Sequence, residues 1–114
     1  MHELSLIASC FDVLEERARE NGATRVVKVV LKVGVMSGVV PDLLESAFDM
    51  YKKGTIAGDA RLEIVVVPVK LRCPDCGGEA VREDTDFSCA GCGSRRVEIV
   101  EGRDLVVERI ELET

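Results

Sequence analysis

Two stretches of the chain place apolar residues at the three- and four-residue spacing of an amphipathic helix. In the first stretch, charged residues lie between the apolar positions Leu4, Ile7, Ala8, Phe11, Leu14 and Ala18. This helix should end at Asn21-Gly22, because glycine commonly follows the last helical turn. The second helix should begin at Pro41, a residue suited to a first helical turn. Its apolar face consists of Leu43, Leu44, Ala47, Phe48 and Tyr51.

Other stretches have the pattern of β-strands. Residues 26–35 predict one strand, with Lys28 and Lys32 on one face and four apolar residues on the other: Val27, Val29, Leu31 and Val33. Residues 61–71 predict a second strand, with a bulge or a sheet edge at Pro68, where the apolar positions change phase. Residues 96–100 and 105–112 predict further strands, separated by a short polar segment that contains glycine.

Four of the five cysteines form two CxxC pairs, each followed by glycine: Cys73, Cys76, Cys89 and Cys92. Four thiolates at this spacing are the tetrahedral set that structural zinc (Zn2+) prefers. Two disulfides are disfavoured because we expect a cytoplasmic protein, and thiols stay reduced there. A four-thiolate iron centre is the main competitor, since it uses the same geometry. We predict a zinc ribbon whose ion is scaffold and not catalyst, because four protein ligands leave no open position.

The predicted elements combine into an α+β fold. Two helices pack on a small three-stranded sheet, and the zinc-ribbon domain is inserted before the last strand, which returns to that sheet. We expect residues 1–71 and 97–114 to form the α+β domain and residues 72–96 to form the zinc ribbon. The fifth cysteine, Cys10, lies beside the apolar stripe of the first helix and is expected to be a small buried hydrophobe.

Charge and composition exclude several classes of function. A net charge of -6 and a pI near 4.8 argue against nucleic acid as a partner, because duplex binding needs a basic surface. The longest apolar run, residues 64–69, is too short to span a bilayer, and His2-Glu3 is no opening for a signal peptide. We therefore expect a soluble cytoplasmic protein. An enzyme is not expected, because no nucleophile–base set or phosphate-binding glycine loop is present.

The single histidine is residue 2, a position with its own chemistry. The Met1 amino nitrogen, the His2 amide nitrogen and the His2 imidazole can bind one ion through fused five- and six-membered chelate rings. Ni(II) and Cu(II) favour such a planar set, and zinc does not. Glu3, water or a partner's group can take the fourth position. The alternative is that His2 is an idle terminal side chain.

The two CxxC pairs and the histidine at residue 2 occur together in a known family. The opening Met1-His2-Glu3-Leu4-Ser5-Leu6, the central Gly34 and Ser37-Gly38-Val39, and the paired CxxCG motifs resemble the HypA/HybF family over the whole chain. The resemblance implies a nickel metallochaperone that delivers Ni2+ for maturation of nickel–iron hydrogenase. It implies that the GTPase HypB and the hydrogenase large-subunit precursor are its partners. It also implies that His2 is the essential nickel ligand, with the Met1 amine and Glu3 beside it. It implies that zinc is bound by Cys73, Cys76, Cys89 and Cys92.

Two positions depart from that family. Many members carry acidic residues where this chain has Val35 and Val40, and the nearest acid is Asp42. Neither position is a first-choice metal ligand in that family. We predict no acidic contribution to the nickel site from Val35 or Val40. Two hypotheses of other classes remain: a zinc-ribbon adaptor that binds protein or nucleic acid without nickel transfer, and an iron electron-transfer centre. The metal content of the purified protein and a nickel titration discriminate among the three.

Overall fold

The computed structural model describes residues 2–82 and 87–114, with side chains from Glu3 onward. In chain order the elements are α1 (His2–Glu20), β1 (Arg25–Gly34), α2 (Pro41–Tyr51), β2 (Arg61–Val67), β3 (Val69–Arg72), β4 (Glu79–Arg82), β5 (Glu98–Glu101) and β6 (Leu105–Glu113). Both predicted helices are confirmed. The strand β4 has no counterpart among the predicted elements, because its four residues show no clear apolar alternation.

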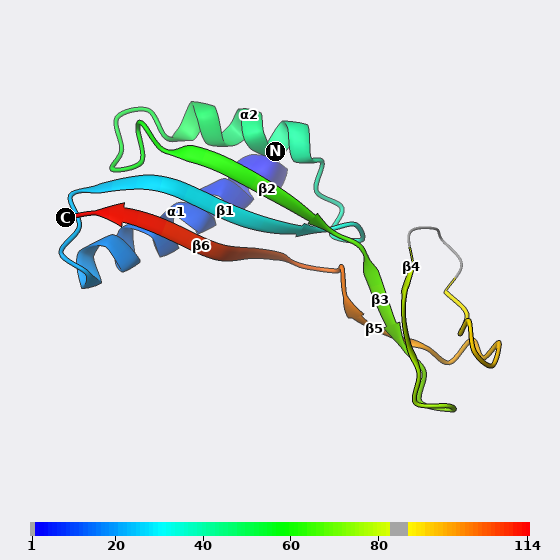
Figure 1. Ribbon diagram of the computed structural model, residues 1–114. Helices are drawn as coiled ribbons and strands as arrows, with labels where there is room; N and C mark the ends of the chain where they lie inside the picture. Colours follow the sequence, from blue (N-terminus) through cyan, green and yellow to red (C-terminus); the bar gives the residue numbers. More distant parts are fainter. Residues whose placement is uncertain (1, 83–86) are drawn as a thin grey trace.

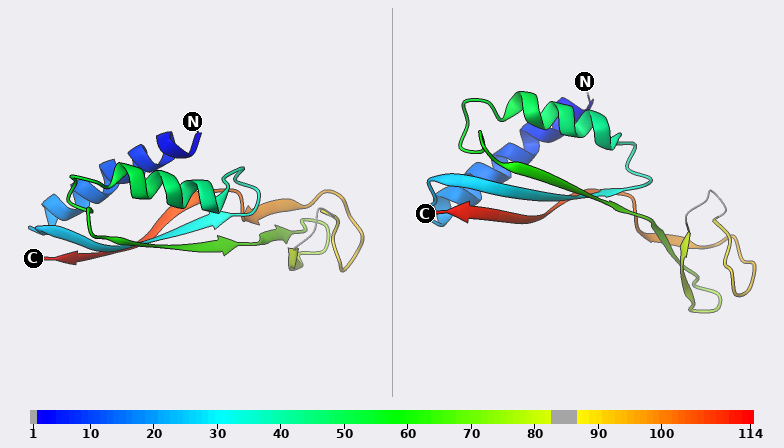
Figure 2. Two further views of the ribbon diagram at one scale, coloured as in Figure 1. Left: turned by 90° about the horizontal axis from the view of Figure 1, so that it is seen from above. Right: turned by 45° about the horizontal axis from the view of Figure 1, so that its top comes forward.

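The strands form two separate three-stranded sheets (Figure 1). The first has the order β2-β1-β6, in which β1 pairs with β2 in parallel and with β6 antiparallel. Both helices lie on the same side of this sheet (Figure 2). The second sheet has the order β4-β3-β5 and carries the cysteine segment. The α+β fold with an insertion before the last strand is therefore confirmed.

Local sequence explains where α1 ends. Gly22 has a φ of +62°, in the left-handed region that suits glycine. The backbone N–H of Ala23 donates to the carbonyl of Ala18 at 2.9 Å, and that of Gly22 donates to Arg19 at 3.2 Å. These two bonds satisfy carbonyls that the helix leaves free at its end. The chain is thereby turned toward β1.

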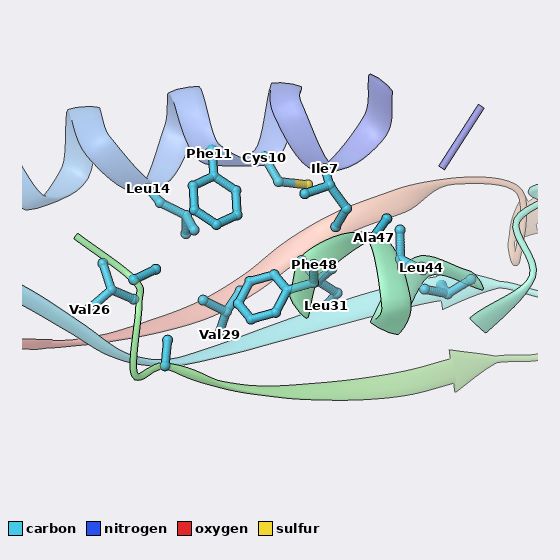
Figure 3. Packing of buried hydrophobic residues seen from close by; sticks show 13 residues of the cluster. Ile7, Cys10, Phe11, Leu14, Val26, Val29, Leu31, Leu44, Ala47 and Phe48 are labelled. Atoms are coloured by element: carbon cyan, nitrogen blue, oxygen red, sulfur yellow. The ribbon is translucent and has the colours of Figure 1, made fainter. Parts of the chain in front are cut away.

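The helices and the first sheet enclose one hydrophobic core (Figure 3). At its centre Phe11 of α1 packs against Phe48 and Tyr51 of α2, with ring centroids 5.6 and 4.7 Å apart. The fully buried aliphatic side chains around them include Ile7, Leu14, Val26, Val29, Leu31 and Leu44. Cys10 is 7% exposed and belongs to this cluster, which confirms it as a small core residue. Burial raises the pKa of its thiol.

One predicted strand face is wrong by one residue. The alternation places Val27 on the same face of β1 as Val29, but Val26 occupies the core instead and is fully buried. The register of β1 against β6 shifts between Val26 and Lys28, so that Val27 is an additional residue there. Such a bulge reverses the alternation of side chains. The faces of Val29, Leu31 and Val33 beyond the bulge are as predicted.

The chain passes between the two sheets at Pro68 and again at Gly102, and the two passages touch. The single strand predicted over residues 61–71, with a bulge or edge at Pro68, is wrong: β2 ends before Pro68, and β3 begins after it in the other sheet. A Cβ on Gly34 would lie 2.3 Å from the carbonyl carbon of Gly102. A Cβ on Gly102 would lie 2.8 Å from the Pro68 oxygen. Three backbone segments therefore cross here at a distance that only glycine permits.

The molecule is elongated as a result of this arrangement. Its extents are 52 × 28 × 17 Å and its radius of gyration is 17.3 Å. A compact domain of this length would have a radius of gyration of about 13 Å. The second sheet extends away from the end of the first (Figure 1). The domain boundaries expected from the sequence stay a prediction, and β3 and β5 are the segments on which they depend.

Candidate metal centre

The four paired cysteines lie on two loops with the same backbone hydrogen bonds. In the first knuckle, residues 73–78, the N–H of Gly77 donates to the Cys73 carbonyl and the N–H of Cys73 donates to the Gly78 carbonyl, each at 2.8 Å. In the second knuckle, residues 89–94, Gly93 and Ser94 take the corresponding places, again at 2.8 Å. Gly77 and Gly93 both have a φ of +75°. The repeated CxxCG motif therefore builds the same turn twice.

The two knuckles face each other and bring the four sulfur atoms together. All four lie within 4.8 Å of one another. The Cys73 and Cys92 sulfurs are 3.6 Å apart, and the Cys76 and Cys89 sulfurs are 3.5 Å apart. Four thiolates at about 2.3 Å from one zinc ion would be separated by about 3.8 Å. The cluster therefore has the donor type and the size of a tetrahedral zinc site, and none of these cysteines forms a disulfide.

Backbone amides and neighbouring sulfurs change the acidity of these thiols in opposite directions. The backbone N–H groups of Cys92 and Gly91 lower the pKa of the Cys89 thiol to about 6. For Cys92, the backbone N–H of Ser94 acts to lower the pKa, but the neighbouring cysteine sulfurs raise it to about 12. Four adjacent thiols resist ionising together because their negative charges repel. A divalent cation removes that conflict, since thiolate is the form that binds metal.

The second sheet positions the cluster. Cys73 follows β3 directly and is 2% exposed, whereas Cys76 and Cys92 are exposed. Glycines give the loops room next to sulfur: a Cβ on Gly78 would lie 3.4 Å from the Cys76 sulfur, and one on Gly91 would lie 3.7 Å from the Cys89 sulfur. One ligand is therefore anchored in the sheet while two remain at the surface.

The predicted nickel ligands are residues 1–3, far from the four cysteines in the sequence. His2 is the first residue of α1, and Met1 lies outside the described residues. Glu3 is 9% exposed, and it is the buried charged residue of the described part of the chain. In Figure 1 the start of α1 lies beside α2 and away from the second sheet. The structure therefore separates the cysteine cluster from the predicted nickel site.

The two knuckles also meet through a side-chain contact that the sequence does not indicate. The Ser94 hydroxyl donates to the Asp75 carboxylate at 2.5 Å, and Arg96 lies 3.4 Å from the same carboxylate. Neither residue type is a zinc ligand of first choice, and 18 residues separate Asp75 from Ser94. No periodicity or motif indicates that these side chains meet.

Comparisons with known proteins agree with this structure. Residues 1–112 match a family described as HypA, a metallochaperone for hydrogenase and urease nickel incorporation. The hydrogenase maturation factor HypA of Aquifex aeolicus is 44% identical over 113 residues, which cover 99% of this chain and 98% of that protein. The corresponding factor of Moorella thermoacetica is 40% identical over 111 residues, or 97% of this chain and 98% of that protein.

Solved structures give the same result. The solution structure of the nickel metallochaperone HypA from Helicobacter pylori has a TM-score of 0.75 and 30% identity, with 97% of both chains covered. A second solution structure of a HypA protein has a TM-score of 0.78 and 32% identity, covering 98% of this chain and 96% of the other. The family match and these relatives extend over almost the whole chain, so both the fold and the cysteine cluster fall within the likeness. The chain therefore belongs to the HypA family of metallochaperones for nickel incorporation.

Proposed function

We propose that this chain carries Ni(II) and delivers it for assembly of the nickel–iron hydrogenase active site. Membership of the HypA family over residues 1–112 is the observation that carries the proposal. The cysteine cluster supports a structural zinc site beside the nickel function. The alternative of a zinc-ribbon adaptor without nickel transfer is not favoured, because the likeness covers the N-terminal segment as well as the ribbon.

The nickel ligands proposed are the His2 imidazole, the His2 amide nitrogen and the Met1 amine. Together they form a planar nitrogen set, which suits Ni(II) and not zinc. Glu3 is a secondary ligand or a neighbouring charge. Its position supports this role, because it follows His2 directly in the first turn of α1.

Zinc and nickel have different tasks in this proposal. Cys73, Cys76, Cys89 and Cys92 hold zinc, which supplies a rigid closed centre with no position for a substrate. Nickel is the cargo and binds where ligands from a partner can reach it. Relatives are named maturation factors or metallochaperones, which supports a carrier without catalysis of its own.

The partners that we propose are the GTPase HypB and the precursor of the hydrogenase large subunit. The family description supports a role in hydrogenase maturation, and the two partners are the finer step of the proposal. In the described part of the chain, neither helix has the length and apolar composition needed to cross a membrane. We place the protein in the cytoplasm, where transfer to an unassembled precursor would occur.

A nickel titration of the zinc-loaded, tag-free protein tests the function. His2→Ala should abolish high-affinity nickel binding. Zinc content should stay unchanged, because the cysteine cluster is on the second sheet and His2 is in α1. Glu3→Gln should weaken nickel binding by a smaller factor, and Glu16→Gln on the exposed side of α1 is its control. Wild-type nickel affinity in His2→Ala would contradict the proposed carrier mechanism.

A further inference from the structure

A side-chain hydrogen bond joins the two knuckles beside the four sulfur atoms. Asp75 lies inside the first knuckle, and its carboxylate oxygen Oδ2 accepts a hydrogen bond of 2.5 Å from the Ser94 hydroxyl. Ser94 is the last residue of the second knuckle, and its carbonyl accepts a hydrogen bond of 2.8 Å from the Cys89 N–H. The contact therefore connects two loops that each supply only two sulfurs.

The hydroxyl of Ser94 is oriented for this contact. It accepts a hydrogen bond of 3.1 Å from the backbone N–H of Arg96, so its own proton is available to donate to Asp75. The Arg96 guanidinium lies 3.4 Å from the other carboxylate oxygen of Asp75. That side chain is 78% exposed, so the ion pair contributes less than the short hydrogen bond.

The repeated motif shows that this contact has no symmetric counterpart. When the two knuckles are matched by their cysteines, Asp75 corresponds to Gly91, and Ser94 corresponds to Gly78. The reciprocal contact would therefore be between two glycines, which have no side chains to make it. Asp75 and Ser94 are the positions at which the otherwise repeated sequence provides a polar link.

We propose that Asp75 and Ser94 form a clasp that holds the two knuckles together and slows the release of zinc. Neither residue is a zinc ligand, and both act by positioning the loops that carry the ligands. Zinc leaves only after thiolates separate from it, and separation of one knuckle removes two thiolates together. A hydrogen bond to a charged acceptor opposes that separation more strongly than one between neutral groups. The inference rests on the proposed zinc site and is independent of nickel binding.

The rate of zinc release to an excess of a colorimetric chelator tests the clasp in the full-length, zinc-loaded protein. Asp75→Ala and Ser94→Ala should each release zinc about tenfold faster than the wild type, in line with one charge-assisted hydrogen bond. The two effects should not multiply in the double variant, because each single variant already lacks the shared hydrogen bond. Asp75→Asn keeps an acceptor oxygen and should lie between the wild type and Asp75→Ala.

Glu79→Ala is the matched control. It also removes one carboxylate from the second sheet, where Glu79 pairs with Lys70 at 3.4 Å, but it links no knuckles. It should release zinc at the wild-type rate.

Wild-type release in Asp75→Ala or Ser94→Ala would overturn the clasp, as would effects that multiply in the double variant. Since Asp75→Asn and Ser94→Ala change few atoms, they decide the question even if Asp75→Ala does not fold. A wild-type protein that contains no zinc would overturn the underlying zinc site instead.

Discussion

At the scale of single residues, the proposed nickel site depends on a free chain end. The amine of Met1 and the amide nitrogen of His2 close a five-membered chelate ring, and the imidazole closes the next. An N-terminal extension before Met1 converts the amine into an amide, which is a much poorer ligand. Nickel affinity should fall, but less than in His2→Ala, because the imidazole remains. The planar nitrogen-rich centre should give a yellow-to-orange absorption in the tag-free protein alone.

Titration and absorption spectra of the extended and tag-free proteins check this prediction. Zinc content should be the same in both, since the extension is remote from the cysteine cluster in sequence. If the extended protein binds nickel with unchanged affinity and spectrum, then the Met1 amine is not a ligand.

The sequence predicts some residues of the metal centre and not others, for a physical reason. The spacing within each CxxC pair already determines that its two sulfurs can bind one ion, so the four cysteines were predictable as a set. The Asp75–Ser94 contact depends on how the two knuckles face each other. That orientation comes from the pairing of β3 with β5, which joins residues near 71 to residues near 99. A contact created by tertiary pairing leaves no periodic signal in the chain.

At the scale of elements, long and regular segments were predictable, while irregular strands were not. The apolar stripes of α1 and α2 gave both helices, since each buries one continuous face. In β1 the bulge at Val27 changed which residues are buried, because alternation alone carries no information about an additional residue. An irregularity at Pro68 was predictable, but that β2 and β3 are separate strands of different sheets was not, since pairing partners lie far along the chain.

The backbone at Gly34 lies close to Gly102, and Gly102 lies close to Pro68. We therefore expect Gly34→Ala to lower the stability of the protein strongly. The added Cβ would lie 2.3 Å from a backbone carbon of Gly102, and backbone is less able to yield than a flexible side chain. We expect a loss of at least about 2 kcal/mol in the free energy of unfolding, as in overpacked cores. Urea denaturation of the zinc-loaded protein measures this loss.

Gly38→Ala is the control for Gly34→Ala. Gly38 has a φ of +78° and no atom within 4 Å of an added Cβ, so it tests backbone strain without a clash. Its cost should be about 1 kcal/mol, the strain of a side chain at a left-handed backbone conformation. Gly34 has no positive φ, so a Gly34→Ala protein as stable as the wild type would show that the close approach there has no effect on stability.

At the scale of the whole molecule, the two sheets differ in what stabilises them. The first sheet shares a core with both helices, and that core contains nearly all of the fully buried large side chains. The second sheet has Val69, Leu71 and Cys73 as its buried apolar residues. Val81 is 58% exposed, and Phe87 and Val97 are only half-buried. So small a core cannot offset the conformational entropy of ordering these loops.

Zinc should therefore supply the folding free energy of the cysteine segment, on the order of 10 kcal/mol in comparable small sites. Chelation of zinc, or Cys76→Ser, should unfold residues 73–82 and 87–95 and leave the helices and the first sheet folded. Amide spectra of the labelled protein measure both parts in one sample. The peaks of α1, β1, α2 and β6 should keep their positions, because their core contains no residue of the second sheet. Peaks of β3 and β5 should shift or broaden, since these strands join the two parts of the chain.

Cys10→Ser retains the zinc ligands and should keep the dispersed peaks of the cysteine segment. If that segment stays dispersed after zinc is removed, its fold does not depend on the metal.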